Sequence, residues 1–267
     1  FNTNGGERMR ITSGGSVGIG ESSPTRNLVI KDTDGQVDIG LVTSNTGVSA
    51  VMFADTDDSN IGRIQYLHST NDLTFTTNDS EAVRINSSGN VGIGTVPKTF
   101  NTVDGALQIG TRQTLTSFSN DVGIGYNHYY SSGWKYTNSD VARRFSSNST
   151  APFIWQYAAS GSADAAITWS EAMRLDSSGN LLHGKTASGI ANNGIELRAN
   201  NDVLITKDGA TALYLNRKSS DGEIIEFRKD GANAGEIGVV NGNNLIISNN
   251  ADNSGLQFGS GSITPAY

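Results

Sequence analysis

The sequence predicts an all-β protein of short antiparallel strands and hairpins, and three observations support this fold class. A stretch that opens Glu-x-x-Arg and closes on a short strand ending in glycine occurs three times, at 7–20, 81–94 and 171–184. Runs that alternate apolar and polar residues, bounded by Asn, Asp, Gly and Ser, recur along the chain, which is the pattern of strands and turns. The chain has 32 glycines and only 36% hydrophobic residues, little for one large core.

The repeated stretch reads as a β-hairpin. Twelve positions are identical between residues 1–20 and 75–94, and repeats take precedence in interpreting a sequence. In the second copy, residues 81–85 form the first strand, the Ser-Ser-Gly-Asn turn at 87–90 reverses the chain, and 91–94 form the second strand. Gly92 and Gly94 leave one face of that second strand without side chains, so another backbone or chain can lie against it. A dinucleotide-binding loop is excluded, because no third glycine and no helix follow.

The repeats divide the chain into four predicted modules: the end of a truncated module at 1–24, a β module at 25–97, an enlarged aromatic-rich module at 98–187 and a C-terminal module at 188–267. Because the sequence opens inside a repeat, we expect it to be a segment of a longer protein. One helical turn is possible at 139–144, inside the third module. The remaining runs outside the repeated hairpins have the strand pattern, among them 27–30, 37–40, 62–66, 71–75, 212–216, 221–227, 235–239 and 243–247.

Composition excludes several classes of function. The net charge of −7 and the pI near 4.9 argue against a nucleic-acid-binding surface. The absence of cysteine excludes disulfides, thiol chemistry and cysteine metal sites. No apolar run approaches ~18 residues, so membrane insertion is not expected. No cofactor and no metal site are predicted.

Each repeat carries an arginine beside a glutamate, and we expect Arg10, Arg84 and Arg174 to be structural, each paired with a carboxylate. In the third repeat His183 takes the place of Ile19 and Ile93. If those isoleucines face the interior of an assembly, copies of His183 come together there and can titrate or hold an ion. Alternatively, a one-residue slip gives the inward position to Leu182 and leaves His183 at the surface.

The motif Glu-x-Met/Val-Arg-Ile/Leu-x-Ser-Ser-Gly-Asn-Val-Gly-Ile-Gly, with the segments at 133–136 and 221–231, resembles bacteriophage tail fibres and tailspikes that end in a self-cleaving, endosialidase-style intramolecular chaperone. The chaperone is absent from this sequence, so no cleavage residue can be carried over. The resemblance implies an elongated, modular, parallel homotrimer of the β-prism or triple-β-helix type. It also implies a place in the virion tail, beside other tail proteins and in contact with a glycan or protein of the host cell surface.

Two kinds of candidate site follow from the residues. Aromatic side chains crowd the third module, where they either fill its core or present faces on which sugar rings stack. The receptor-binding candidates among them are Tyr126, Tyr129, Tyr130, Trp134, Tyr136 and Trp155. For enzymatic chemistry the acidic residues are unpromising: Asp55, Asp57 and Asp58 lie in a turn-like run, and Glu223 and Glu226, three apart on a strand, should point to opposite faces.

The sequence therefore favours a non-enzymatic structural and receptor-binding segment of a phage tail fibre, assembled from three identical chains. A glycan-depolymerising tailspike and a bacterial trimeric surface adhesin remain the alternatives. Thin apolar content, spread along strands with glycine on one face, supports the homotrimer independently of the resemblance, because neighbouring chains would complete the burial.

Overall fold

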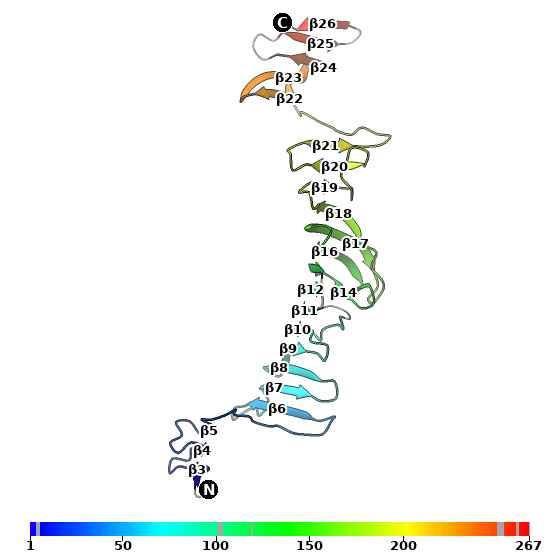
Figure 1. The fold of residues 1–267 in the computed structure, drawn as a ribbon. Helices are drawn as coiled ribbons and strands as arrows, with labels where there is room; N and C mark the ends of the chain where they lie inside the picture. The colour runs from blue at the N-terminus through cyan, green and yellow to red at the C-terminus, as the bar shows by residue number, and fades with distance from the viewer. Residues whose placement is uncertain (4–5, 101–103, 119, 250–253, 260–261, 267) are drawn as a thin grey trace. The chain divides into compact units, whose positions relative to one another are not determined.

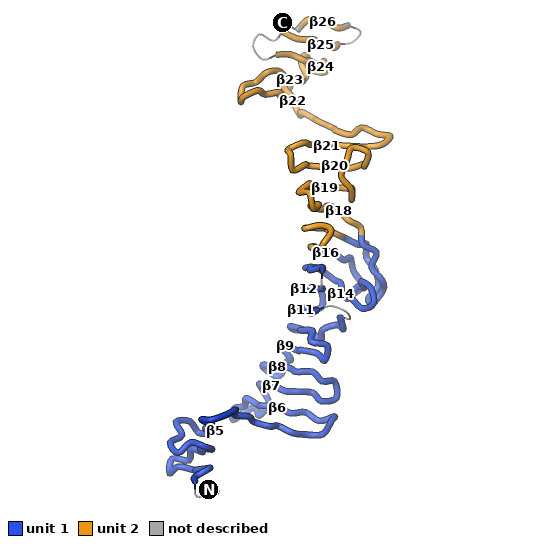
Figure 2. Tube along the Cα trace, in the orientation of Figure 1, with its two compact units in different colours: residues 1–146, 157–169 blue, residues 147–156, 170–267 orange. Residues whose placement is uncertain are grey.

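The computed structural model describes residues 1–3, 6–100, 104–118, 120–249, 254–259 and 262–266, and these form an all-β protein without helix (Figure 1). The predicted fold class of short, mostly antiparallel strands is confirmed. Two compact units are present, one of residues 1–146 and 157–169, the other of 147–156 and 170–267 (Figure 2). These units do not follow the four predicted modules, which stay a prediction.

Unit 1 contains a two-stranded sheet, a three-stranded sheet, a long meandering sheet and a separate hairpin. The first two sheets comprise β1 (Asn2–Thr3) and β2 (Gly6–Glu7), then β3 (Met9–Ile11), β4 (Val17–Ile19) and β5 (Leu28–Ile30). The long sheet of unit 1 is the part of a 14-stranded sheet that contains β6 (Val48–Phe53), β7 (Gly62–Leu67), β8 (Asp72–Thr77), β9 (Ser80–Ile85), β10 (Val91–Ile93), β11 (Gly105–Ile109), β12 (Gln113–Phe118) and β13 (Asp121–Tyr126). The hairpin is β14 (His128–Tyr130) with β15 (Trp134–Tyr136).

Strands β16 (Asp140–Asn148) and β17 (Phe153–Gly161) carry residues of both units. Unit 2 continues with two antiparallel meanders. The first is β18 (Ser170–Leu175), β19 (Leu181–His183), β20 (Gly194–Leu197) and β21 (Val203–Thr206). The second is β22 (Gly222–Lys229), β23 (Ala232–Val240), β24 (Asn244–Ser248), β25 (Gly255–Gly259) and β26 (Ser262–Ala266).

The three repeats fold into the same hairpin. In the second copy β9 pairs with β10, and the turn between them closes when the Asn86 amide donates to the Asn90 carbonyl at 3.0 Å. The turn glycine has a φ of +78° in this copy, and its equivalents Gly15 and Gly179 have +83° and +81°. Only glycine adopts this backbone conformation without steric cost, so the reversal predicted for this turn is present in every copy.

The pairing of the next strand differs with the residue at the centre of the hairpin's second strand. A Cβ on Gly92 would overlap the Thr95 carbonyl and Pro97, because the chain folds back over that glycine before β11 pairs with β10 in parallel. Gly18 is covered in the same way before β5 pairs in parallel with β4. The backbone against the glycine therefore belongs to the same chain. In the third copy Leu182 fills this space, and β20 instead pairs antiparallel with β19.

Two β-bulges place residues that are three apart on the same face of their strand, although such residues are expected on opposite faces. Between the pairs Phe75–Val83 and Thr76–Glu81, β9 carries one extra residue, so Glu81 shares a face with Arg84. A second shift lies between Glu223 and Ile225. Glu223 and Glu226 consequently lie on the same face of β22, and the prediction of opposite faces was wrong.

Three further local predictions are wrong. Residues 139–144 form no helical turn, because the first part of β16 extends them beside β13. The alternating runs at 37–40 and 212–216 have the strand pattern but are not strands among the residues that the structure describes. Their apolar side chains are exposed, including Val37, Ile39, Leu213 and Tyr214. A strand needs a partner for its backbone groups, and these two segments have none in the described part of the chain.

Candidate functional site

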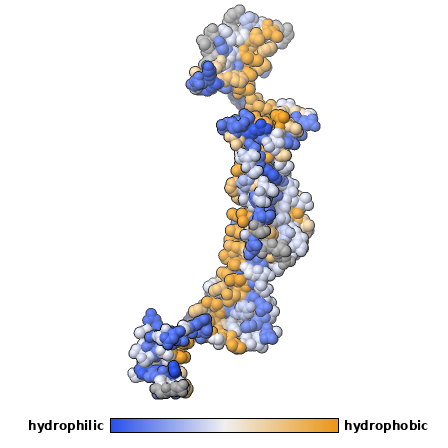
Figure 3. Space-filling model, viewed as in Figure 1, coloured by the Kyte–Doolittle hydropathy of each residue, from blue (hydrophilic) through white to orange (hydrophobic). Residues whose placement is uncertain are grey.

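One face of the long sheet in unit 1 is apolar, mostly aliphatic, and its side chains are exposed or half-buried. The strand register places Val51, Ile64, Phe75, Val83, Ile93 and Ile109 in one row across β6 to β11. A second row on the same face contains Tyr66, Leu73, Ile85, Val91, Leu107, Leu115 and Ile124. Figure 3 shows apolar residues gathered along one side of these strands. We call these two rows the aliphatic face.

The opposite face of the same sheet is polar and buried. Thr74 and Thr114 have no exposed surface, and Gln108 is nearly as deep. The loops between the strands supply the cover: the Lys98 amide, for example, donates to the Gln108 side-chain oxygen at 2.9 Å. This arrangement inverts the usual order, in which polar residues face water and aliphatic residues the core. Covering the aliphatic face by another chain would restore that order.

Unit 2 repeats the inversion. In β18 to β21, Leu182 and Glu196 are completely buried, whereas their strand neighbours Ile195, Leu197 and Val203 are exposed. In the second meander Ile247 and Leu256 are paired and exposed, while Ser248 is buried. The inversion therefore recurs in further strands of the 14-stranded sheet and in the five-stranded sheet, whereas Tyr136, Ala142 and Ala158 form an ordinary buried apolar cluster.

The repeat arginines hold the polar side together through ion pairs. Arg84 binds Glu81 through two nitrogens, at 2.7 and 2.5 Å, and also pairs with Asp72. Arg174 binds Glu171 through two nitrogens at 2.6 Å each. The pairing with a carboxylate that the sequence predicts is present, and in the bulged copy the bulge makes it possible.

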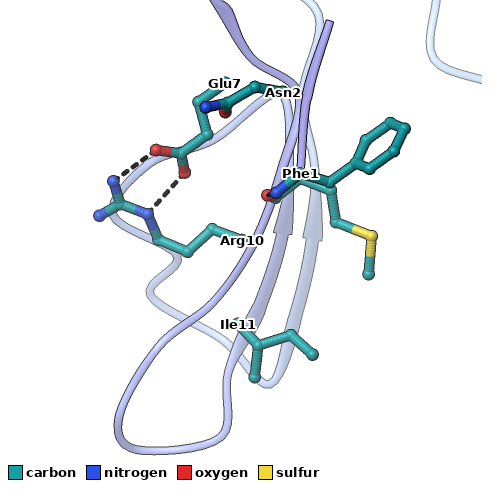
Figure 4. Close-up of a pocket in the computed structure, with 6 residues that line it drawn as sticks. Phe1, Asn2, Glu7, Arg10 and Ile11 are labelled. Atoms are coloured by element: carbon teal, nitrogen blue, oxygen red, sulfur yellow. Dashed lines mark hydrogen bonds and ion pairs between the residues drawn. The ribbon is translucent and has the colours of Figure 1, made fainter.

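The first copy of this ion pair is the most open. Arg10 binds Glu7 at 2.6 and 2.7 Å, and its third nitrogen donates to the Ser22 carbonyl at 2.7 Å. Figure 4 shows the Arg10–Glu7 pair with the side chains of Phe1 and Ile11 pointing away from the pair, and all four residues line one pocket. The side chain of Arg10 is 41% exposed against 14% for Arg84. Burial, and with it the contribution to stability, therefore differs between copies.

Glu196 forms a second polar centre that the sequence does not reveal. Its carboxylate accepts hydrogen bonds from Lys185 Nζ at 2.7 Å, Ser188 Oγ at 2.5 Å, the Gly189 amide at 2.9 Å and Arg198 Nε at 2.8 Å. The hydrogen bond from Lys185 contributes most to holding the pKa of this carboxyl below its ordinary value. Such a fully satisfied carboxylate stabilises the fold and leaves no lone pair free for a substrate.

The aromatic candidates do not form a single site. Tyr129 and Tyr136 are each only 6% exposed, and their hydroxyls donate to Asp164 and to the Ala159 carbonyl. With their rings buried, these two residues have no face on which a sugar could stack, so they belong to the core. Trp155 lies on β17 and belongs to unit 2, whereas the other five belong to unit 1.

The remaining three candidates are half-buried. Tyr130 and Trp134 contact each other edge to face, with ring centroids 5.2 Å apart. The Tyr126 hydroxyl accepts from Arg112 at 2.8 Å and donates to Asp140 at 2.9 Å, and Arg143 lies 5.7 Å from the ring centroid. The carboxylate and guanidinium groups around Tyr126 can hydrogen-bond to a polar ligand. Of the six candidates, Tyr126 therefore keeps the most varied chemistry.

A buried imidazole lies at the centre of the aromatic cluster. His128 has no exposed surface, and its ring meets Trp134 and Trp169 edge to face at 5.0 and 5.5 Å. Gly125 makes room for it, because a Cβ there would overlap the imidazole. Arg144 lies beside it, with its guanidinium 4.2 Å from the Trp134 centroid and ion-paired to Asp121. Burial, helped by the charge of Arg144, lowers the pKa of His128 to about 3.

Among the described residues, no group of three or more His, Cys, Asp or Glu side chains is placed to hold a metal ion. The described residues contain no helix with the length and apolar character needed to cross a membrane. No protein-family model matches the chain, and a search of curated proteins finds no match.

Removing the guanidinium of Arg84 should destabilise the protein more than removing that of Arg10. Arg84→Ala leaves the carboxylates of Glu81 and Asp72 close together without their cation. We expect a loss of about 2 kcal/mol in the free energy of unfolding, below the value for a fully buried pair because some solvent reaches this one. Arg10→Ala is the control, and its exposed pair should change the melting temperature little. Equal melting temperatures for the two variants would contradict this account.

His128 should make the protein less stable in mild acid. Since the folded state holds the imidazole neutral, the unfolded chain alone takes up a proton as pH falls through ~6.5. The stabilising contribution is complete above that pH and is lost as pH falls toward about 3. Between pH 7 and pH 5 the loss should be about 2 kcal/mol per chain. Denaturant titrations at both pH values measure it, and His128→Gln should remove most of the difference; a variant with the wild-type pH dependence would contradict the assignment.

Proposed function

We propose that this chain is a structural and receptor-binding segment of a bacteriophage tail fibre, which assembles from three identical chains and attaches the virion to the host surface. The observation that carries the proposal is the aliphatic face. Soluble monomers rarely expose large continuous apolar surfaces, and such surfaces mark interfaces. Here the exposed side chains include Val51, Ile64, Ile93, Ile109, Leu115 and Ile124 on one sheet.

Identical chains are the partner that fits this face best. The repeats present residues of the same kind at matching places, Met9 and Ile19 in the first copy and Val83 and Ile93 in the second. Parallel copies in the same register would bring each of these residues against its own equivalents. A self-complementary aliphatic surface needs no other partner to exclude water. The number three comes from the resemblance to tail fibres.

The two unpaired segments with strand sequences support the same assembly. Residues 37–40 and 212–216 alternate apolar and polar side chains but lack a partner strand among the described residues. Backbone groups of this kind are usually paired in a folded protein. Neighbouring copies would supply both the missing strand partners and the cover for Ile39 and Leu213, which are exposed in the single chain.

A glycan-depolymerising tailspike is the second candidate, because of one specific observation. Glu223 and Glu226 share a face, and Glu236 lies opposite Glu226 on the next strand. A hydrogen bond to Glu236 raises the pKa of the Glu223 carboxyl. Glycoside hydrolases use two carboxyl groups with different proton affinities. A reducing-end assay on purified host capsule or lipopolysaccharide separates this candidate from the non-enzymatic fibre.

The binding function should depend on the aliphatic face. Ile64→Glu places a charge on that face, which opposes its burial between chains. The wild type and the variant are labelled fluorescently and mixed with a panel of bacterial strains. We expect the variant to lose assembly and to lose binding to the strains that bind the wild type. Flow cytometry measures binding, and sedimentation velocity measures assembly.

Val96→Glu is the matched control for this test. Val96 is more exposed in the single chain than Ile64, 63% against 38%, but lies in the crossover that covers Gly92, on the other side of the sheet. The Val96→Glu variant should leave assembly and binding intact. Wild-type protein that binds no strain, or that releases reducing ends, would overturn the proposed function.

A further inference from the structure

His183 stands in the place that isoleucine holds in the other two repeats. The strand register pairs Met173 with His183, as it pairs Val83 with Ile93 and Met9 with Ile19. No one-residue slip has occurred in the third copy. The histidine is therefore on the same face of its hairpin as the two isoleucines, which are 39% and 41% exposed.

The imidazole lies in an otherwise apolar, open row. Strand pairing continues the row from Met173 through His183 to Ile195 and Ile205, across β18 to β21. The preceding residue, Leu182, points to the opposite side and is completely buried. His183 itself is exposed in the single chain. It is the one polar side chain in that row of four.

Few charged groups face this row. Lys207 follows Ile205 by two residues and lies just beyond the end of β21. The other charges of these strands lie on the buried side, where Lys185 is bound to Glu196 and Arg174 to Glu171. The strands of this row thus place no carboxylate beside the imidazole to stabilise its protonated form.

We propose that His183 makes the association of identical chains through this face dependent on pH, with the neutral imidazole buried in the interface and its protonation driving the chains apart. The inference rests on the proposed function, because it requires copies to cover this face. Neutral imidazole can be buried among aliphatic side chains at modest cost, but imidazolium cannot unless it is paired. In a trimer three such charges would also repel one another.

The expected effect follows from proton linkage. An imidazole in water takes up a proton as pH falls through ~6.5. If assembly requires the neutral form, each histidine lowers the association constant by up to about tenfold per pH unit below that value. Three histidines lower the constant for the trimer by up to about a thousandfold per unit. Assembly is thus favoured at pH 7.5 and weakened at pH 5.5.

The repeat itself supplies the test variants. His183→Ile restores the residue of the other copies, and Ile93→His adds a second histidine at the equivalent place in the second copy. The mass of each protein is measured by light scattering over a dilution series at pH 7.5 and 5.5. Wild type should dissociate at higher concentration at pH 5.5 than at pH 7.5, His183→Ile should show a smaller difference between the two pH values, and Ile93→His should show a larger one. His68 and His128 are common to all three proteins, so their contributions cancel in the comparison.

The outcomes separate this inference from the proposed function. A wild type that is monomeric at pH 7.5 overturns both. A wild type that is trimeric at pH 7.5, with the same pH dependence as His183→Ile, overturns this inference alone. The inference is supported if His183→Ile loses less association between pH 7.5 and pH 5.5 than the wild type, and Ile93→His loses more.

Discussion

The sheets of this chain cover their polar face and leave their apolar face open, which is the reverse of an ordinary domain. The hydrophobic effect therefore favours covering the apolar face. Threonine, glutamine, arginine and glutamate fill the side that the loops cover, as with Thr74, Gln108 and Glu196. The aliphatic side chains remain on the open side. Removing one of them from water would contribute about 1–2 kcal/mol for a side chain that is already half covered. The rows on one sheet alone supply enough such residues to favour association strongly.

The charged groups on the buried polar side are held by one another. Glu196 accepts four hydrogen bonds, and Arg84 joins two carboxylates in one ion-pair network. Polar groups at such positions cost free energy only when they lack partners. In the second and third copies, where the arginine is largely buried, the hairpin therefore needs its arginine and glutamate at fixed places.

Much of the fold could be predicted from the sequence, because period-two alternation and turn glycines are local signals. The hairpins, their turns and the pairing of the repeat arginines follow from such signals. The bulge beside Glu81 and the one beside Glu223 could not be predicted, since an extra residue in one strand depends on the partner strand. The role of Gly92 was predicted only in part: room for another backbone is present, but the chain's own crossover occupies it.

The candidate site was less accessible to prediction. The density of aromatic residues in the third module indicated a special region, yet Tyr129 and Tyr136 are core residues and His128 lies buried among tryptophans. The pair of glycines at 123 and 125 was the available signal, because each makes room for a side chain, Arg144 and His128. Alternation does reveal which residues share a face. It does not reveal which face the loops will cover, and the inversion follows from that choice.

The solution mass of the unmodified chain tests the central claim most directly. If the aliphatic face is covered by identical chains, light scattering coupled to size exclusion at neutral pH should give three times 28.1 kDa. Dilution should not yield a folded monomer, because the exposed rows would have no cover. A stable, folded, monodisperse monomer of 28.1 kDa would contradict the account.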